Sequence, residues 1–332
     1  MKDKLTIAVN WAGACGGCDV SILDTEDKIF SITKIADIIY WPVAMDFKRK
    51  DLAALEPDSI DITLFNGMIR NSEHLEDAKL LREKSKVMVA FGSCAHLGGI
   101  PGMANFTDRQ GIFDVSYITN PSTGNPDGTL PLTRVDAGGR DLTLPEFHDQ
   151  VRALDRVVDV DYYVPGCPPP FNVIMKTIEV VSAVHEGGDL PARGSVIADR
   201  NALCGDCPRK DTVRPGLMEN VVRPHEKMID PDTCFLEQGI ICMGPFTRGG
   251  CGHLCIEANM PCRGCFGPAE KQYDQGTEAL SAFGSVVSAG RDDYVPRGEM
   301  LRPVNKVKDP LGTFYRFSLP SAIINRNMKE GK

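Results

Sequence analysis

The sequence predicts an α/β fold: a doubly wound parallel sheet followed by a loop-rich segment that is dense in cysteine. Two patterns carry this prediction. In the first half, short apolar runs rich in β-branched and aromatic residues alternate with stretches of helical periodicity, which is typical of a parallel sheet covered on both faces. In the second half this periodicity fades, and eight of the twelve cysteines fall between Cys204 and Cys265.

The expected strands are short apolar runs bounded by turn residues. They are Leu5–Asn10, Ile38–Val43, Ile60–Asn66, Lys86–Phe91 and Val160–Val164. The expected helices are Ser72–Ser85, Phe171–His185 and Thr277–Ala289. The stretch 102–145 contains ITNPSTGNPDGTLP and interrupts the alternation, so we expect it to be a long surface excursion.

A chain of 332 residues is long enough for about two domains. We expect the sheet domain over residues 1–193 and a second domain with a C-terminal tail over 194–332. From 194 to about 268 the apolar residues are too few for a conventional core, so metal centres should order this region. The tail contains GTFYRFSLP, which suits either an exposed docking surface or a strand packed against its own domain.

Composition and charge exclude several classes of protein. The apolar fraction of 42% and the charged fraction of 25% are those of an ordinary globular chain. A formal net charge of −8 disfavours a nucleic-acid partner, and no apolar run is long enough to insert into a membrane. The first residues, MKDKLTIAVN, lack an export signal. We therefore expect a cytoplasmic protein, in which closely spaced cysteines bind metal more often than they form disulfides.

Four cysteines follow the carboxyl ends of predicted strands. Cys15 and Cys18 follow the first strand in GACGGCD, Cys94 follows the fourth in FGSCAHLGGIPG, and Cys167 follows the fifth in VPGCPPP. Because such ends meet at one edge of a parallel sheet, the four thiols are expected to converge. Four thiolates suit a 4Fe-4S cluster or a structural zinc ion. Taken alone, Cys15 and Cys18 would also suit a thioredoxin-like redox pair.

The other eight cysteines form a second group, and spacing alone does not decide how they divide into two sets of four. They are Cys204, Cys207, Cys234, Cys242, Cys251, Cys255, Cys262 and Cys265. Twelve cysteines make three tetrads with none left over, which indicates a line of iron-sulfur centres rather than a catalytic pocket. Three zinc sites in a zinc-stabilised interaction module are the alternative from another functional class.

These motifs resemble those of the small, electron-transferring subunit of NiFe hydrogenases. WAGACGGCDVSI is similar to that family's first cluster motif, FGSCAHLGGIPG to its second and VPGCPPP to its third. HEKMIDPDTCFLEQGIICMGPFTRGGCGHLCIEANMPCRGCFGP is similar to its two-cluster domain. The resemblance covers about residues 5 to 290, and it is strongest to the methyl-viologen-reducing, coenzyme F-420-non-reducing type of methanogenic archaea.

The resemblance implies a flavodoxin-like sheet domain and three 4Fe-4S clusters, with no catalytic residue in this chain. It implies the proximal set Cys15, Cys18, Cys94 and Cys167, the medial set Cys251, Cys255, Cys262 and Cys265, and the distal set Cys204, Cys207, Cys234 and Cys242. Many better-known members have a histidine as first distal ligand and a 3Fe-4S medial cluster. Cys204 and Cys255 supply thiolates instead, so we expect three 4Fe-4S clusters.

The resemblance also implies partners. They are a large subunit that holds the NiFe site and oxidises hydrogen, a 2Fe-2S delta-type electron-transfer subunit, and a heterodisulfide reductase complex that uses flavin-based electron bifurcation in methanogenesis. The small subunit of a sulfhydrogenase-type, NAD(P)-linked hydrogenase is the alternative within electron transfer. The related respiratory-complex subunit is disfavoured because its motif has two adjacent cysteines, whereas Cys15 and Cys18 are separated.

Two further residues lie between presumed ligands. His253 stands between Cys251 and Cys255 and is either a ligand or a hydrogen-bonding residue. Arg263 stands between Cys262 and Cys265, where its charge would either raise the potential of a cluster or simply neutralise it.

Overall fold

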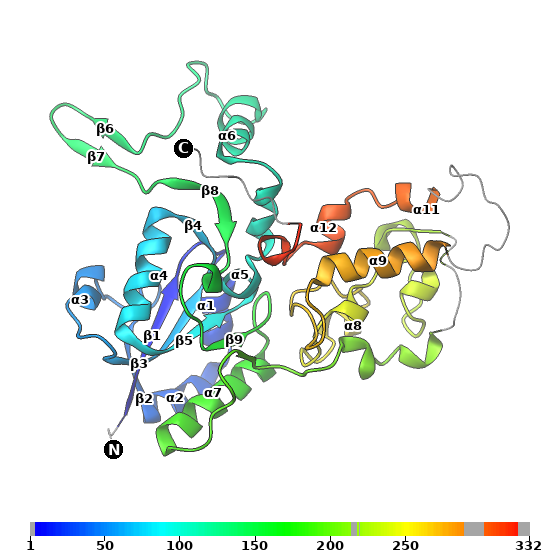
Figure 1. The fold of residues 1–332 in the computed structure, drawn as a ribbon, viewed down its shortest axis with the longest axis horizontal. Helices are drawn as coiled ribbons and strands as arrows, with labels where there is room; N and C mark the ends of the chain where they lie inside the picture. The colour runs from blue at the N-terminus through cyan, green and yellow to red at the C-terminus, as the bar shows by residue number, and fades with distance from the viewer. Residues whose placement is uncertain (1–3, 214–217, 219, 289–301, 325–332) are drawn as a thin grey trace.

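Six parallel strands form the central sheet in the computed structural model, which describes residues 4–213, 218, 220–288 and 302–324 (Figure 1). The spatial order is β10-β9-β5-β3-β1-β2. Counted along the chain, the first five of these strands follow the flavodoxin-like order 2-1-3-4-5, and β10 extends one edge. The strands are β1 (Leu5–Trp11), β2 (Ala36–Tyr40), β3 (Ile60–Asn66), β5 (Ser85–Phe91), β9 (Tyr162–Val164) and β10 (Ser195–Val196).

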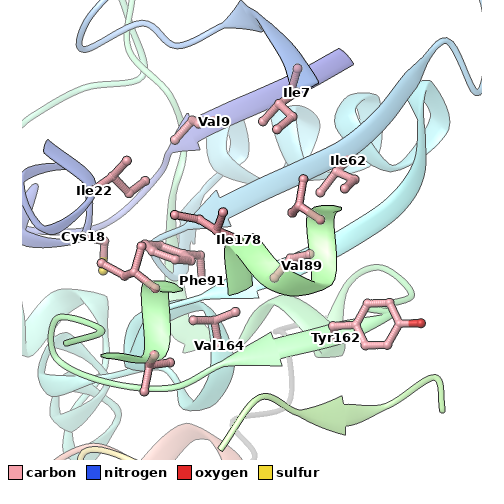
Figure 2. Packing of buried hydrophobic residues seen from close by; sticks show 14 of the residues in the cluster. Ile7, Val9, Cys18, Ile22, Ile62, Val89, Phe91, Tyr162, Val164 and Ile178 are labelled. Atoms are coloured by element: carbon pink, nitrogen blue, oxygen red, sulfur yellow. The ribbon is translucent and has the colours of Figure 1, made fainter. Parts of the chain in front are cut away.

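Helices cover both faces of this sheet, as the sequence predicted. On one face, α2 and α7 pack against alternate residues of the strands, among them Ile7 and Val9 of β1 (Figure 2). On the other face, α3, α4 and α5 pack against a cluster that includes Ala8. The helices of this half are α1 (Gly17–Leu23), α2 (Ile29–Ile35), α3 (Arg49–Ala53), α4 (Ser72–Lys84), α5 (Ser93–Leu97), α6 (Arg109–Phe113) and α7 (Phe171–Glu186).

The expected strands and helices form, with small shifts at their ends. The strand expected at Ile38–Val43 ends earlier, at Tyr40, because the chain turns at Trp41 ahead of Pro42. The edge strand β10 was not predicted, because two residues are too short to show a periodicity. β10 belongs to the sheet although it lies just past residue 193. The division into domains 1–193 and 194–332 remains a proposal.

The excursion over 102–145 lies on the surface, as expected, but it is not structureless. It contains α6 and an exposed hairpin of β6 (Arg134–Asp136) and β7 (Asp141–Thr143), which projects from the sheet domain (Figure 1). Directly after it, β8 (Phe147–Arg152) pairs with the short strand β4 (Ile69–Asn71) and so anchors the excursion to the body.

The second half has an apolar core of its own, which corrects our expectation that metal centres alone would order it. Leu203, Phe235 and Ile240 pack against Phe283 and Phe314. Most of this core comes from the window 194–268 itself, and α9 and the tail supply the rest. The helices here are α8 (Leu254–Glu257), α9 (Gln275–Ser288), α11 (Arg302–Asn305) and α12 (Pro310–Phe314).

The aromatic residues of GTFYRFSLP are buried, so they are not the exposed docking surface that we considered. Phe314 and Tyr315 belong to the second core, and Phe317 is buried as well. The segment forms α12 and a 3₁₀ turn rather than a strand. It packs back on the sheet domain, where the Gly99 N–H donates to the Phe317 carbonyl at 3.1 Å. A docking role for the tail as a whole remains a proposal.

Asp61 of β3 links three neighbouring strands. Its carboxylate accepts the backbone N–H and the hydroxyl of Thr6 at 2.9 and 3.0 Å, and Lys86 Nζ at 2.7 Å. Burial opposes the charge, but these hydrogen bonds outweigh it and lower the pKa of Asp61 to about 2. Since an unfolded aspartate has a pKa of about 3.9, this stabilisation is complete above about pH 4 and is lost as the pH falls towards 2.

We expect Asp61→Asn to lower the free energy of unfolding by about 2 kcal/mol at pH 7, because it removes the charge that these hydrogen bonds stabilise. Anaerobic thermal unfolding followed by circular dichroism should show Tm lower by several degrees. The matched control is Asp37→Asn, because the ion pair that Asp37 forms with Lys4 is exposed. Equal losses in both variants would contradict this role of Asp61.

Candidate iron-sulfur sites

The four cysteines of the proximal set lie at one edge of the sheet. Cys15 and Cys18 follow β1, Cys94 lies in α5 directly after β5, and Cys167 follows β9. Backbone hydrogen bonds tie the loops together: Gly92 N–H donates to the Val164 carbonyl at 2.8 Å, and the next N–H donates to the Gly166 carbonyl at 2.7 Å. Figure 2 shows Cys18 beside Phe91, at the ends of the strands.

The electrostatics of this set shows that its thiols are neighbours. Burial raises the pKa of Cys18, and the thiols of Cys94, Cys167 and Cys15 raise it further. Burial, together with Cys167 and Cys15, raises the pKa of Cys94 to about 12. Thiols of this kind stay protonated at neutral pH unless a metal takes the proton's place, so metal binding here would release protons.

The distal set also comes together. Burial raises the pKa of Cys204 to about 12, with added contributions from Cys242, Cys207 and Cys234. Cys204 lies in a 3₁₀ turn, Leu203–Gly205, and the other three lie in loops around it. Their positions are therefore fixed by the packing of loops rather than by helices or strands.

The medial set lies between the other two. Burial raises the pKa of Cys265 to about 12, and the thiols of Cys251, Cys255 and Cys167 raise it further. Burial raises the pKa of Cys262 well above its usual value, and Cys242 and Cys265 contribute to this shift. The medial thiols thus interact with each other, with Cys167 of the proximal set and with Cys242 of the distal set.

Backbone hydrogen bonds cross both boundaries between the sets. The Cys262 N–H donates to Cys242 Sγ at 3.3 Å, which joins the medial set to the distal one. The Cys167 backbone hydrogen-bonds the Cys265 thiol, and Ser93 Oγ donates to the Cys265 carbonyl at 2.6 Å, which join the medial set to the proximal one. The three sets therefore form one continuous row.

The residues present fit iron-sulfur clusters. Backbone hydrogen bonds from Gly244 and Cys262 reach Cys242, and others from His253 and Leu254 reach Cys251. Hydrogen bonds to sulfur and burial are the means by which proteins hold and tune such clusters. None of the twelve cysteines is in a disulfide.

Among the described residues, no three side chains of His, Cys, Asp or Glu converge closely enough to hold one metal ion. A zinc site and a 4Fe-4S cluster can both use four thiolates, so the metal content of the protein decides between them.

His253 does not point at a thiol in this structure. Its Nε2 lies 3.2 Å from the Leu203 carbonyl oxygen and 3.3 Å from Asp206 Oδ1. The side chain thus connects the medial segment to the segment that carries Cys204, in agreement with the hydrogen-bonding alternative.

Sequence reasoning missed Arg209, which is 4% exposed and holds the loops of the distal set together. Its guanidinium lies over the Phe235 ring at 4.1 Å from the ring centre. It donates to Asn259 Oδ1 at 2.8 Å and to three backbone carbonyls, those of Asp230, Thr233 and Ile256. In the sequence it is one basic residue in CPRK, and nothing there distinguishes a buried arginine from an exposed one.

Gly92 is required next to Cys18. Its φ of +85° favours glycine, and a Cβ at this position would overlap Cys18 Sγ. We expect Gly92→Ala to prevent assembly of the proximal cluster, so that iron per chain falls from about 12 to about 8. Gly124→Ala is the control, because that position is open and its φ is not positive. Full iron content in Gly92→Ala would contradict the assignment.

Known proteins match this chain along its whole length. A model of the family described as NADH ubiquinone oxidoreductase, 20 kDa subunit, matches residues 15–181. The iron-sulfur subunit of the F420-non-reducing hydrogenase from Archaeoglobus profundus is 40% identical over 330 residues, which are 98% of this chain and 99% of that protein. The chain belongs to this family of hydrogenase subunits. The corresponding F420-non-reducing hydrogenase protein of Methanothermobacter marburgensis is 36% identical over the whole of both chains.

A solved structure supports the fold of this hydrogenase subunit. The [NiFeSe] hydrogenase from Desulfovibrio vulgaris Hildenborough has a chain that superposes with a TM-score of 0.51, covering 80% of this chain and 94% of its own. At 16% identity this likeness concerns the fold alone. As a hydrogenase subunit, the chain is part of an oxidoreductase. In the part of the chain that the structure describes, no helix is both long and apolar enough to span a bilayer.

Proposed function

We propose that this chain is the electron-transferring small subunit of a cytoplasmic NiFe hydrogenase, with three 4Fe-4S clusters in a row. The observation that carries the proposal is the continuous row of thiols, in which the medial set touches both neighbours through Cys167 and Cys242. A row suits the passage of electrons from one end to the other, whereas a catalytic site needs only one centre.

We assign four thiolates to each cluster. The proximal ligands are Cys15, Cys18, Cys94 and Cys167, the medial ligands are Cys251, Cys255, Cys262 and Cys265, and the distal ligands are Cys204, Cys207, Cys234 and Cys242. The pKa values of Cys18 and Cys204 are raised by thiols of their own sets, which supports the proximal and distal sets. The pKa of Cys262 is raised by Cys242 as well as by Cys265, so the boundary between the medial and distal sets rests on the resemblance. Cys204 and Cys255 complete sets of four, which favours 4Fe-4S over 3Fe-4S centres.

The chain's own residues hold the clusters and adjust their environment. Each bound cluster would accept and release one electron at a time. Burial of Cys262 limits the access of water to one side of the medial set, whereas Cys255 is exposed, and backbone N–H groups give the sulfur atoms hydrogen-bond donors. No residue of this chain needs to act as an acid, a base or a nucleophile.

The proximal end of the row is where we place the NiFe large subunit. Cys15 and Cys167 are exposed there, so this end of the row opens to the surface. Large apolar side chains are exposed in the same motifs, among them Trp11, Ile100 and Phe171. Exposed apolar residues around an open cluster edge are typical of a protein interface. Electrons from hydrogen oxidation on that subunit would enter here.

Beyond the distal set we propose a 2Fe-2S delta-type subunit and then a heterodisulfide reductase complex, in which electrons from hydrogen would serve flavin-based bifurcation in methanogenesis. The support is the similarity to the F420-non-reducing hydrogenase relatives over nearly the full length of both chains. Chains that copurify with the native complex test this part of the proposal directly. A nicotinamide-reducing partner in their place would favour the sulfhydrogenase type.

Iron, acid-labile sulfide and zinc per chain, measured on protein purified without oxygen, test the number of clusters. Three cubanes give about 12 iron and 12 sulfide with negligible zinc. About three zinc ions and no sulfide would instead make the chain a structural scaffold. Electron paramagnetic resonance of anaerobically oxidised protein adds a second test, since a strong 3Fe-4S signal would remove Cys255 from the medial ligands.

A further inference from the structure

A cavity of about 270 Å³ beside the medial and distal sets has apolar walls and five cationic side chains, against a single acidic one. The segments 221–225, 240–241 and 306–316 form its walls together with Arg263. Its permanently cationic residues are Arg223, Arg263, Lys306, Lys308 and Arg316, and His225 lies among them. In a chain with a net charge of −8 this is a local reversal of sign.

These charges have no carboxylate partner among the residues that the structure describes. None of the five cations takes part in an ion pair there. Arg316 donates to the Gly312 carbonyl at 2.9 Å, and Lys306 contacts the Asn220 amide oxygen. Asp309 is the one acidic residue of the lining, and it accepts the Gly312 N–H at 2.9 Å as the cap of α12.

The cavity lies directly beside the row of thiols. Ile240 and Ile241 of its wall precede Cys242, and Arg263 follows Cys262. Arg263 is also close enough to Arg316 for the two charges to repel each other. Figure 1 shows α11 and α12, which border this region, on the lobe that holds the medial and distal sets, well away from α3 and α4.

We propose that this basic cavity docks an acidic segment of the protein that accepts electrons from the distal cluster. The inference rests on the proposed function, which makes the distal end the exit of the row. Unpaired cations attract an acidic partner to one place on the surface, while the acidic remainder of the protein repels that partner elsewhere. The cavity volume of about 270 Å³ is below the range of about 300–1,000 Å³ for pockets that hold drug-sized ligands. It therefore suits one or two carboxylate side chains.

The test is the rate of hydrogen-driven electron transfer in the assembled hydrogenase, measured with the copurifying acceptor subunit and with methyl viologen. Arg223→Glu combined with Lys308→Glu reverses two exposed charges of the cavity without touching a presumed ligand. We expect the ratio of the acceptor rate to the viologen rate to fall about tenfold or more at low ionic strength. Added salt should lower the wild-type ratio towards that of the variant.

The matched control is Lys50→Glu combined with Lys79→Glu, which changes the net charge equally at exposed positions of α3 and α4. It should keep the wild-type ratio. An equal fall in both variants would show an effect of net charge, and an unchanged ratio in the cavity variant would reject the docking site. Absence of any hydrogen-driven reduction in the wild type would instead reject the proposed function.

Inorganic pyrophosphate distinguishes a free anion from a protein segment as the occupant. Pyrophosphate binding is measured by calorimetry on the wild-type complex and on the Arg223→Glu, Lys308→Glu variant, both without the acceptor subunit. We expect no saturable binding that is present in the wild type and absent from the variant. Such binding would make the cavity a site for a small anion and would overturn the docking proposal.

Discussion

Replacing Cys94 by serine is expected to reduce hydrogen-dependent viologen reduction by the assembled hydrogenase to background. Cys94 is the proposed ligand in the middle of the proximal set, between the loops that carry Cys18 and Cys167, and the residue is 9% exposed. A serine hydroxyl is a poor substitute for a thiolate on iron, so the proximal cluster should be lost. Electrons that leave the large subunit would then have no first acceptor. Anaerobic viologen assays under hydrogen measure this loss.

Two controls separate a broken row from a failed assembly. On the proposed function, hydrogen/deuterium exchange would take place on the large subunit, and it should persist in Cys94→Ser if the complex still forms. Iron should fall from about 12 to about 8 per chain, because the medial and distal sets are intact. Unimpaired viologen reduction in a variant shown to lack the proximal cluster would reject the row as the route of the electrons.

Replacing Arg209 by alanine should destabilise the second half of the chain by about 3 kcal/mol, because a buried acceptor that loses its donor costs about 1–3 kcal/mol. The substitution would leave the carbonyls of Asp230, Thr233 and Ile256 without their hydrogen-bond donor, and it would leave a cavity over the Phe235 ring. Because Arg209 follows Cys207, and Asp230 and Thr233 lie just before Cys234, we expect the distal cluster to be lost first. Iron content after purification and anaerobic thermal unfolding measure the two effects.

Neighbouring variants show whether the shape of the arginine matters. Arg209→Lys keeps the charge but not the planar fork that reaches several acceptors, so it should recover only part of the stability. Lys210→Ala is the matched control, because Lys210 is exposed and makes one long contact with the Gly205 carbonyl at 3.4 Å. An Arg209→Ala chain with full iron content and wild-type Tm would show that the packing of the loops alone is sufficient.

The sheet domain could be predicted from the sequence because its signals are local. Each of the strands that carry the proximal set ends in a motif rich in glycine or proline, and the parallel arrangement alone brings Cys15, Cys94 and Cys167 to one edge. The alternation of strand-like and helical stretches also predicted that helices cover both faces of the sheet, as the packing of α7 and α4 confirms.

The second half could not be predicted in the same way, because its order depends on contacts between distant segments. Phe235 and Phe283 meet in one core although no periodicity connects them. The spacing of eight cysteines leaves their division open, and only the folded chain brings Cys262 beside Cys242. The role of Arg209 could not be predicted from the sequence either, because its hydrogen-bond acceptors lie between 21 and 50 residues away along the chain.

The return of the tail to the sheet domain bears on the order of events at the ribosome. The proximal loop has no space for a Cβ at Gly98 or Gly102, because the Pro320 ring fills it, and Ser321 Oγ donates to the Leu97 carbonyl at 3.3 Å. Ser321 is translated 224 positions after Leu97, which it covers. The loop that carries Cys94 is therefore covered only after residue 321 has been synthesised, so iron delivered to a nascent chain before that point would meet an open loop. The segment that covers this loop thus comes from a later part of the chain than any of the twelve cysteines.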